Sequence, residues 1–290
     1  MSLRIVVLAK QVPDTANITG EAMKPDGTVN RGALPAIFNP EDLNALEMAL
    51  CLRDQHGGHI TVVSMGPPGA AELLRDALYR GADRVILLTH RLFAGADTLA
   101  TSYALARAVA TLGTPDIVLC GRQAIDGDTA QVGPQIAEKL GIPQVTYVDR
   151  VVELGEGTIV VSRTTDRGTR IVRSTLPVLL TIVSTANRPR PPSVRRIMTY
   201  KKARTQTELM ASTEDYLETS ALGDKGLLIE EWGVDMIGAE PNRCGMAGSP
   251  TWVKRVASVV ISPREVKRVE PTQAGISALV EELITEHVLS

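Results

Sequence analysis

The stretch Asp116–Val145, DIVLCGRQAIDGDTAQVGPQIAEKLGIPQV, decides how the rest of the chain is interpreted. It opens with Ile117–Cys120, a short apolar run ending at Gly121 that is typical of a strand buried on both faces. A polar turn, Asp126–Thr129, follows, and apolar residues then recur at helical spacing until Gly141. This strand, turn and helix predict free N–H groups at the carboxyl edge of a sheet, where they can hold a phosphate.

An ordinary crossover from strand to helix is the alternative interpretation of the same residues. Asp128 or Thr129 would then be a common N-cap. The turn has neither a G-x-G-x-x-G nor a G-x-x-x-x-G-K-[ST] pattern. Its two aspartates would repel a phosphate unless their carboxylates cap the helix or bind ribose hydroxyls. From spacing alone, both interpretations stand.

Strand and helix patterns alternate through the first half of the chain, which predicts an α/β fold. The expected fold is a doubly wound, mostly parallel sheet with helices on both faces and a ligand crevice at its carboxyl edge. The predicted strands are Arg4–Leu8, His59–Met65, Arg84–Leu88 and Ile117–Cys120. A first helix is predicted to begin at Pro40 with Asn39 as its N-cap. Two further helices are predicted over Ala70–Arg80 and Asp97–Leu112. Beyond Pro143 an added antiparallel meander is predicted from Val151–Leu154, Thr158–Thr164, Arg170–Ser174 and Val178–Val183.

The pattern changes near residue 185. Residues 1–204 are expected to form the α/β domain, and residues 185–202 combine prolines with basic side chains as an exposed linker or contact loop. Val194, Ile197 and Met198 are apolar within this charged segment, which favours a docking surface over a solvated one. Residues 205–290 are expected to form an extended C-terminal arm of helices and loops that ends in a helix over 273–287.

Composition excludes several classes of protein. The 290-residue chain has a net charge of −2 and 3% aromatic residues, so neither nucleic acid nor a membrane surface is expected as a partner. No segment approaches the length of a membrane span, and a cytoplasmic protein is expected. The three cysteines lie far apart, which predicts neither a metal site nor a disulfide framework. No side chain is predicted to act as a catalytic acid, base or nucleophile.

Several stretches resemble the β subunit of electron-transfer flavoproteins, in the right order from residue 3 to residue 204. They are Ala9–Asp14 (AKQVPD), Asn39–Asp42 (NPED), Gly121–Pro134 (GRQAIDGDTAQVGP), and Val161–Gly168 (VSRTTDRG) with Leu176–Val178. Asn187–Arg190 with Ile197-Met198 is similar to the family's partner-docking segment. The resemblance implies a Rossmann-like, adenine-nucleotide-binding fold and a heterodimer with an α subunit that serves acyl-CoA dehydrogenases.

The resemblance also implies the nucleotide site and the docking residues. Amides of Thr129–Val132 would hold a diphosphate, Asn39 and Asp42 would hold adenosine atoms, and Val194 would take the place of the family's apolar docking residue. The arm over 205–290 would pack on the α subunit. The full predicted site is Ala9, Asn39, Asp42, Met65, Asp126, Asp128, Thr129, Ala130, Gln131, Val132 and Gly133.

The resemblance implies that the bound nucleotide is either FAD or AMP. The run from Asp126 to Pro134 and the later stretch Gly245–Val253 are similar to the electron-bifurcating branch of the family, whose β subunit binds a second FAD and accepts hydride from NADH. In that branch electrons pass to the FAD of the α subunit and to a low-potential acceptor such as ferredoxin. The alternatives are a β subunit with a structural AMP and a stand-alone ATP-binding protein of the same fold.

Overall fold

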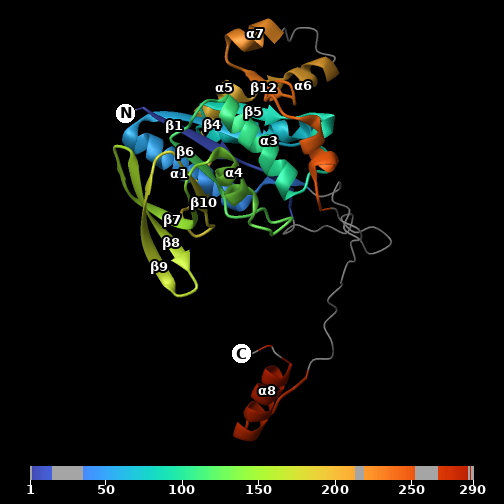
Figure 1. Ribbon diagram of the computed structural model, residues 1–290. Helices are drawn as coiled ribbons and strands as arrows, with labels where there is room; N and C mark the ends of the chain where they lie inside the picture. Colours follow the sequence, from blue (N-terminus) through green and yellow to red (C-terminus); the bar gives the residue numbers. More distant parts are fainter. Residues whose placement is uncertain (1, 15–34, 213–218, 252–266, 287, 289–290) are drawn as a thin grey trace. The chain divides into compact units, whose positions relative to one another are not determined.

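A computed structural model of the chain divides it into two compact units (Figure 1). The first comprises residues 1–22 and 30–254 and holds the sheet, and the second comprises residues 23–29 and 255–290 and holds helix α8 (Gln273–Thr285). The residues that the structure describes are 2–14, 35–212, 219–251, 267–286 and 288, with the backbone alone for 219–221.

The described residues of the first unit form a ten-stranded mixed sheet. Eight neighbouring strands, from β11 to β7, run parallel, and β8 and β9 continue antiparallel beyond β7. In spatial order the strands are β11 (Arg204–Thr205), β12 (Leu228–Trp232), β5 (Arg84–Leu88), β4 (Gly58–Met65), β1 (Leu3–Leu8), β6 (Ile117–Gly121), β10 (Val178–Ile182), β7 (Gln144–Gly155), β8 (Thr158–Thr165) and β9 (Gly168–Thr175). This arrangement confirms the predicted α/β fold class.

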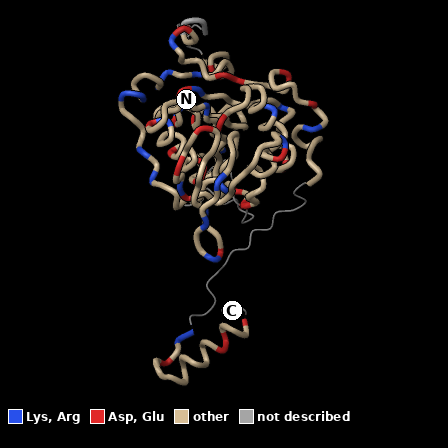
Figure 2. The backbone as a smooth tube through the Cα atoms, turned by 60° about the vertical axis from the view of Figure 1, so that its left-hand side comes forward, with Lys and Arg blue, Asp and Glu red and all other residues tan. Residues whose placement is uncertain are grey.

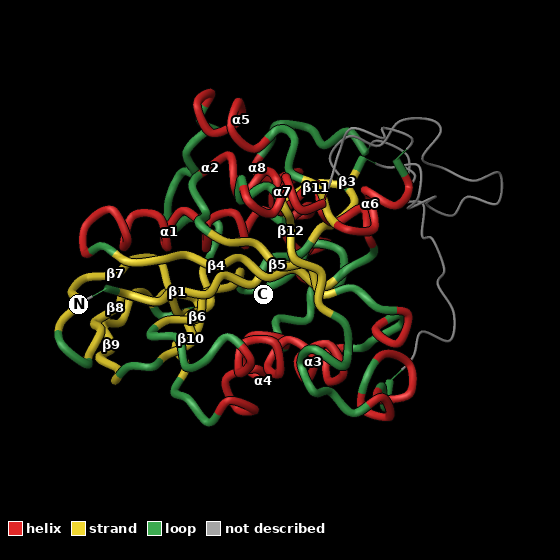
Figure 3. Tube along the Cα trace, turned by 90° about the horizontal axis from the view of Figure 1, so that it is seen from above, coloured by secondary structure: helices red, strands yellow, loops and turns green. Residues whose placement is uncertain are grey.

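Helices cover both faces of the parallel strands (Figure 3). On β1, Ile5 and Val7 pack into an apolar cluster with α1 (Pro40–His56) and α2 (Ala71–Arg80). Val6 and Leu8 point to the other face, into a second cluster with α3 (Thr98–Thr111) and α4 (Val132–Leu140). Because successive side chains of a strand alternate between faces, a strand that is apolar throughout must lie between two helix layers.

Shorter elements complete the described part of the chain. Two strands, β2 and β3, pair in a small antiparallel sheet, and α5 packs against α2. These elements are β2 (Gln11–Pro13), β3 (Ala36–Phe38), α5 (Val194–Tyr200), α6 (Gln206–Ala211), α7 (Thr219–Asp224) and the 3₁₀ helices η2 (Pro68–Ala70), η3 (Arg91–Phe93), η4 (Pro241–Arg243) and η5 (Gly245–Gly248).

The predicted meander is correct for β7, β8 and β9 but wrong for its last strand. Val178–Ile182 lies between β6 and β7 and runs parallel to both. Every residue of this strand is buried. Its continuous apolar sequence suits a position with neighbours on both edges and helices over both faces.

The residues after 204 also differ from the helices and loops that the sequence predicted. Leu228–Trp232 forms a strand, β12, which pairs with β5 in the main sheet. Residues 205–251 therefore share a compact unit with the sheet. Trp252 and Val253 lie outside the described residues.

Charged residues of both signs are interspersed along the described backbone (Figure 2). This distribution agrees with the small net charge of −2. In the described part of the chain, no helix has both the length and the apolar character needed to cross a membrane.

Candidate functional site

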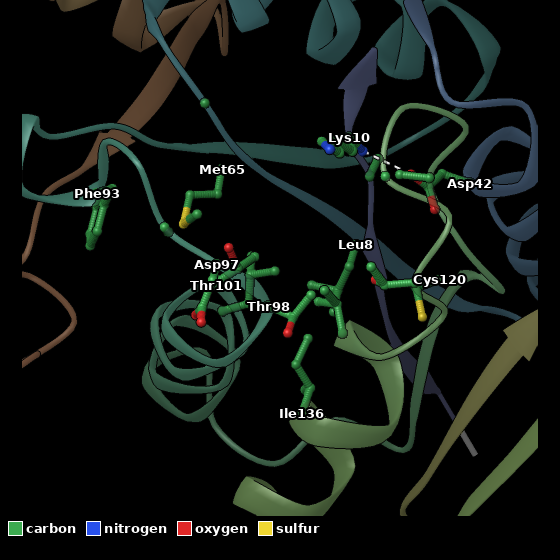
Figure 4. Close-up of a pocket in the computed structure, with 18 of the residues that line it drawn as sticks. Leu8, Lys10, Asp42, Met65, Phe93, Asp97, Thr98, Thr101, Cys120 and Ile136 are labelled. Atoms are coloured by element: carbon green, nitrogen blue, oxygen red, sulfur yellow. Dashed lines mark hydrogen bonds between the residues drawn. The ribbon is translucent and has the colours of Figure 1, made fainter. Parts of the chain in front are cut away.

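A cavity of about 1030 Å³ lies at the carboxyl ends of β1, β4, β5 and β6. Its walls come from the segments that follow these strands and from the first turns of α3 and α4. In Figure 4, Phe93 lies at one side and Asp42 and Cys120 at the other, with Met65 and Asp97 between them. The cavity therefore extends across several strand ends, at the edge where doubly wound sheets bind their ligands.

The loop between β6 and α4 forms one wall. Helix α4 begins only at Val132, and Gln131 holds the N-cap position without a side-chain hydrogen bond. The expectation that Asp128 or Thr129 caps this helix is therefore wrong. Asp128 and Ala130 have positive φ angles of 50° and 53°. Non-glycine residues rarely adopt this conformation, so the loop is held in a specific shape by the rest of the structure.

Asn39 is one residue that holds this loop. It was predicted to cap α1 and does hold the N-cap position before Pro40, but its side chain makes no capping bond. Its Nδ2 instead donates to the carbonyl oxygen of Gln123 at 2.9 Å, and its Oδ1 accepts from the amide of Ile125 at 3.2 Å. Asn39 is fully buried and does not line the cavity. Both polar atoms of its amide therefore position the loop.

Asp42 joins three elements at the deep side of the cavity. Its Oδ1 accepts from the Gly121 amide at 2.7 Å, and its Oδ2 accepts from the Lys10 amide at 2.9 Å. Burial raises the pKa of Asp42 to about 7, although these amides and the Asn39 side chain favour the charged form. Its carboxylate thus fastens the start of α1 to the ends of β1 and β6.

The other charges on this side are also paired. Lys10 Nζ lies 2.7 Å from Asp126 Oδ1, and Arg122 Nη2 lies 3.1 Å from Glu41 Oε1. Asp128 Oδ1 accepts from Gln123 Nε2 at 2.7 Å. Lys10 therefore balances the charge of Asp126, whereas the neutral amide of Gln123 orients the Asp128 carboxylate without cancelling its charge.

Two glycines allow the close packing of this wall. A Cβ at Gly121 would lie 2.6 Å from Asp42 Oδ1 and 2.8 Å from Asp42 N, and a Cβ at Gly133 would lie 2.9 Å from Cys120 Sγ. Gly133 is therefore required for the packing of α4 on the sheet. Gly127 has nothing within 4 Å of such an atom.

The opposite wall was missed by the sequence analysis. It follows β5 and contains η3 and the residues up to Thr98. Asp97 caps α3, accepting from Leu99 and Ala100, and its Oδ2 accepts from the amide and hydroxyl of Thr251 at 3.1 and 2.7 Å. Burial alone would raise the pKa of Asp97, but these hydrogen bonds outweigh it and hold the pKa below its ordinary value. The position of this wall could have been inferred from the strand ending at Leu88, since parallel strands end at one edge.

Most of the predicted nucleotide-site residues line this single cavity. Asn39 and Asp126 are not among the lining residues and instead hold the loop. The lining residues that were predicted are Ala9, Asp42, Met65, Asp128, Thr129, Ala130, Gln131, Val132 and Gly133. Contact of any of them with a nucleotide stays a prediction.

The predicted docking residues lie on α5. Val194 and Met198, one helical turn apart, have 75% and 61% of their surface exposed, whereas Ile197 is half-buried. The segment is more ordered than the linker that its prolines predicted. Arg196 donates to the carbonyl oxygens of Leu78 and Ala82.

Arg190 anchors the same segment to α1. Its guanidinium binds the Glu47 carboxylate at 2.9 Å and Asp54 at 2.8 Å. Glu47 and Asp54 raise the pKa of Arg190 further above its usual range. Arg190 and Arg196 therefore fix the position of this segment, whereas the remaining basic residues, Arg188, Arg195, Lys201 and Lys202, are exposed to solvent.

The chain is thus a doubly wound α/β protein with a cavity at the carboxyl edge of its sheet, where proteins of this class bind their ligands. Residues 26–209 match the family described as "Electron transfer flavoprotein domain". The chain is 42% identical over 99% of its length to the whole of "Electron transfer flavoprotein subunit beta" from Clostridium acetobutylicum, and 43% identical over 98% of its length to 93% of "Protein FixA" from Sinorhizobium fredii. The chain therefore belongs to the β subunits of the electron transfer flavoprotein family.

A third relative belongs to a larger assembly. The chain is 42% identical to "Caffeyl-CoA reductase-Etf complex subunit CarD" from Acetobacterium woodii, over 87% of each chain. The family predicted from the sequence is confirmed by these matches, which together cover nearly the full chain.

Proposed function

We propose that this chain is the β subunit of an electron-bifurcating electron transfer flavoprotein. It would bind FAD in the cavity, accept hydride from NADH, and deliver electrons to the FAD of an α subunit and to a low-potential acceptor such as ferredoxin. The bound FAD would supply the redox chemistry. The residues of this chain would hold the cofactor, orient it and limit the access of water.

The observation that carries this proposal is the size and extent of the cavity. Its volume of about 1030 Å³ lies at the upper end of the roughly 300–1,000 Å³ that ligand pockets span. It runs from the Asp42 and Cys120 side to Phe93, across several strand ends (Figure 4). A dinucleotide suits this extent better than AMP, which would occupy only part of it.

The loop before α4 fits the phosphate groups of such a cofactor. The segment Asp128–Gln131 lines the cavity, and its carboxylate and that of Asp126 are engaged by Gln123 and Lys10. Backbone amides of a loop in positive-φ conformation form concave anion sites. We therefore assign the cofactor diphosphate to the amides of Thr129–Val132, as the sequence predicted.

Asn39 and Asp42 take a changed role in this proposal. Their polar atoms bind the loop and the strand ends, so they would shape the adenosine pocket by holding Gly121–Ile125 in place. Met65 and Ala9, at the ends of β4 and β1, would contact the cofactor from the floor of the cavity.

The partner surfaces follow from the exposed apolar residues. Val194 and Met198 on α5 would dock an acyl-CoA dehydrogenase or a related reductase, a partner class suggested by the name of the CarD relative. Residues 205–290 would contact the α subunit, and α8 carries exposed Ile276, Val280 and Ile284 along one face for this purpose.

The test is a count of cofactors in the purified heterodimer. The chain is expressed with its α subunit, and flavin and AMP are extracted and quantified by chromatography. Two FAD molecules per heterodimer, and flavin absorbance that bleaches with NADH, are expected. One FAD with one AMP per heterodimer would contradict the bifurcating function and support the structural-AMP alternative. A stable monomer that hydrolyses ATP would contradict the heterodimer itself.

A further inference from the structure

The cationic side chains of the cavity wall are not equivalent. Lys10 is paired with Asp126, and Arg122 with Glu41. Arg91 also lines the cavity, yet it forms no ion pair or side-chain hydrogen bond with any residue that the structure describes. Among the described lining residues, it is the arginine or lysine whose charge is not balanced by a neighbouring carboxylate.

Arg91 sits on a fixed piece of backbone. It opens η3, which His90 caps by accepting from the Leu92 amide through Nδ1 at 3.2 Å. The carbonyl oxygen of Ala94, just after η3, accepts from the Met246 amide at 3.1 Å. A cation on a held backbone binds an anion at a lower entropic cost than one on a free loop.

Arg91 and the loop assigned to the cofactor diphosphate lie on different walls of the cavity, since Arg91 follows β5 and the loop follows β6. Phe93, the last residue of η3, lies across the cavity from Asp42 and Cys120 (Figure 4). Arg91 is exposed to solvent, whereas Asp42 is buried. A ligand that arrives from solvent can therefore reach the exposed Arg91 side chain while a cofactor occupies the buried part of the cavity.

We propose that Arg91 binds the diphosphate of the dinucleotide electron donor, an inference that rests on the proposed function. A guanidinium presents paired N–H groups that match two phosphate oxygens, and an unpaired one does not first have to leave a carboxylate. Its uncompensated charge also attracts an anionic donor toward the cavity. Arg91 is thus a binding residue for a ligand that must enter and leave.

The test compares Arg91→Gln and Arg91→Lys with Arg170→Gln in the purified heterodimer. Arg170 is an exposed arginine without a described partner, on the edge strand β9, away from β5 in the strand order. Binding of NADH, NADPH and NAD⁺ is measured by titration of the flavin absorbance, and FAD per heterodimer is counted for every variant.

Arg91→Gln is expected to weaken NADH and NADPH binding alike, by about tenfold, the effect of one charge-assisted hydrogen bond. Arg91→Lys retains part of the affinity, Arg170→Gln retains all of it, and the FAD content stays at two per heterodimer. The salt dependence of NADH binding decreases in Arg91→Gln because one phosphate contact is lost.

Three results overturn the inference. Unchanged NADH affinity in Arg91→Gln would show that the guanidinium does not contact the donor. Loss of FAD from the variant would make Arg91 a cofactor-holding residue instead. A loss of affinity for NADPH alone would show that Arg91 contacts the 2′-phosphate and not the diphosphate. Failure of the proposed function is distinct, because the wild-type heterodimer itself would then lack the second FAD or fail to react with NADH.

Discussion

At the cavity edge, acidic side chains hold backbone amides, whereas in the α5 segment, residues 187–200, basic side chains hold carbonyl oxygens and acids. Asp42 accepts from the amides of Gly121 and Lys10. Arg196 donates to the carbonyls of Leu78 and Ala82, and Arg190 binds Glu47. In both regions charged side chains join a helix to a neighbouring segment of backbone.

The two regions differ in which chemical groups remain available to a ligand or partner after these internal contacts are made. At the cavity edge the carboxylates of Asp42 and Asp126 are bound within the protein, and the loop before α4 offers backbone N–H groups, which favours an anionic ligand. In the α5 segment Arg190 and Arg196 are bound within the protein, and Val194 and Met198 are exposed near Arg195, which favours an apolar contact bordered by positive charge. A charged sequence therefore does not by itself show that charge is what a surface offers.

The largest expected effect concerns the protonation of Asp42. Its pKa in the folded chain, about 7, lies above the ordinary value of 3.8, so the folded protein keeps the proton over a range in which the unfolded chain has lost it. The free energy of unfolding should therefore decrease as pH rises from about 4 to about 7, by up to roughly 4 kcal/mol. Denaturant unfolding at fixed protein concentration across this range measures the slope.

Asp42→Asn is the control for this slope. It should remove the dependence between pH 4 and pH 7 while lowering stability overall, because an amide cannot accept from both backbone N–H groups. Several described carboxyl groups with lowered pKa, Asp54, Asp97 and Glu230, lose their contribution only at more acidic pH. A slope that persists unchanged in the variant would contradict the assignment to Asp42.

Arg190→Met tests the anchoring of the α5 segment. Glu47 has 9% of its side chain exposed and would lose its guanidinium partner. We expect stability to fall by roughly 3 kcal/mol, the lower end for breaking a buried pair, because Arg190 is a third exposed and its amide still donates to Glu47. Combining it with Glu47→Met should recover most of the loss, and a double variant as unstable as the single one would argue against this explanation.

Gly121→Ala tests the tight packing at the cavity edge. The added methyl group would overlap with the backbone of Glu41 and Asp42 at the start of α1. Stability should fall by about 2 kcal/mol, with loss of bound cofactor because the loop moves with Gly121. Gly127→Ala is the matched control in the same loop, since nothing lies within 4 Å of the new atom. Equal effects of the two substitutions on unfolding would refute the packing argument.

Val194→Asp should have the smallest effect on stability and a specific effect on partner docking. The side chain is 75% exposed, so unfolding should change by no more than about 0.5 kcal/mol. If Val194 is a central contact with the proposed dehydrogenase or reductase partner, electron exchange with that partner should slow by roughly tenfold. Val152→Asp, at an exposed position on β7, should leave this rate unchanged, and equal slowing by both variants would remove α5 from the interface.

The sequence predicts the central strands well because each is a continuous apolar run. It cannot distinguish a parallel from an antiparallel position for Val178–Ile182, since either would be buried there, and strand order depends on contacts distant in sequence. Strand β12 was missed because Glu230 and Glu231 interrupt its apolar residues. Both are engaged within the fold, by Arg84 and by Thr207.

The β6 side of the cavity was predictable from its own residues, whereas the β5 side could be inferred only from the topology of the sheet. Gly121, Asp128 and Gly133 carry recognisable turn and packing chemistry, whereas Thr89–Thr98 has no motif and is identified only by its place after a parallel strand. Asn39 shows a further limit. An asparagine before a helix is a good N-cap, and the sequence does not reveal that its amide reaches a loop more than eighty residues later.

Asp97 connects the start of α3, at the rim of the cavity, to Thr251. The same carboxylate that caps α3 grips Thr251, the last described residue before position 267. Both oxygens of this carboxylate are used, one by the α3 cap and one by Thr251. Replacing Asp97 would therefore remove the cap of α3 and release Thr251 from the cavity rim in a single step.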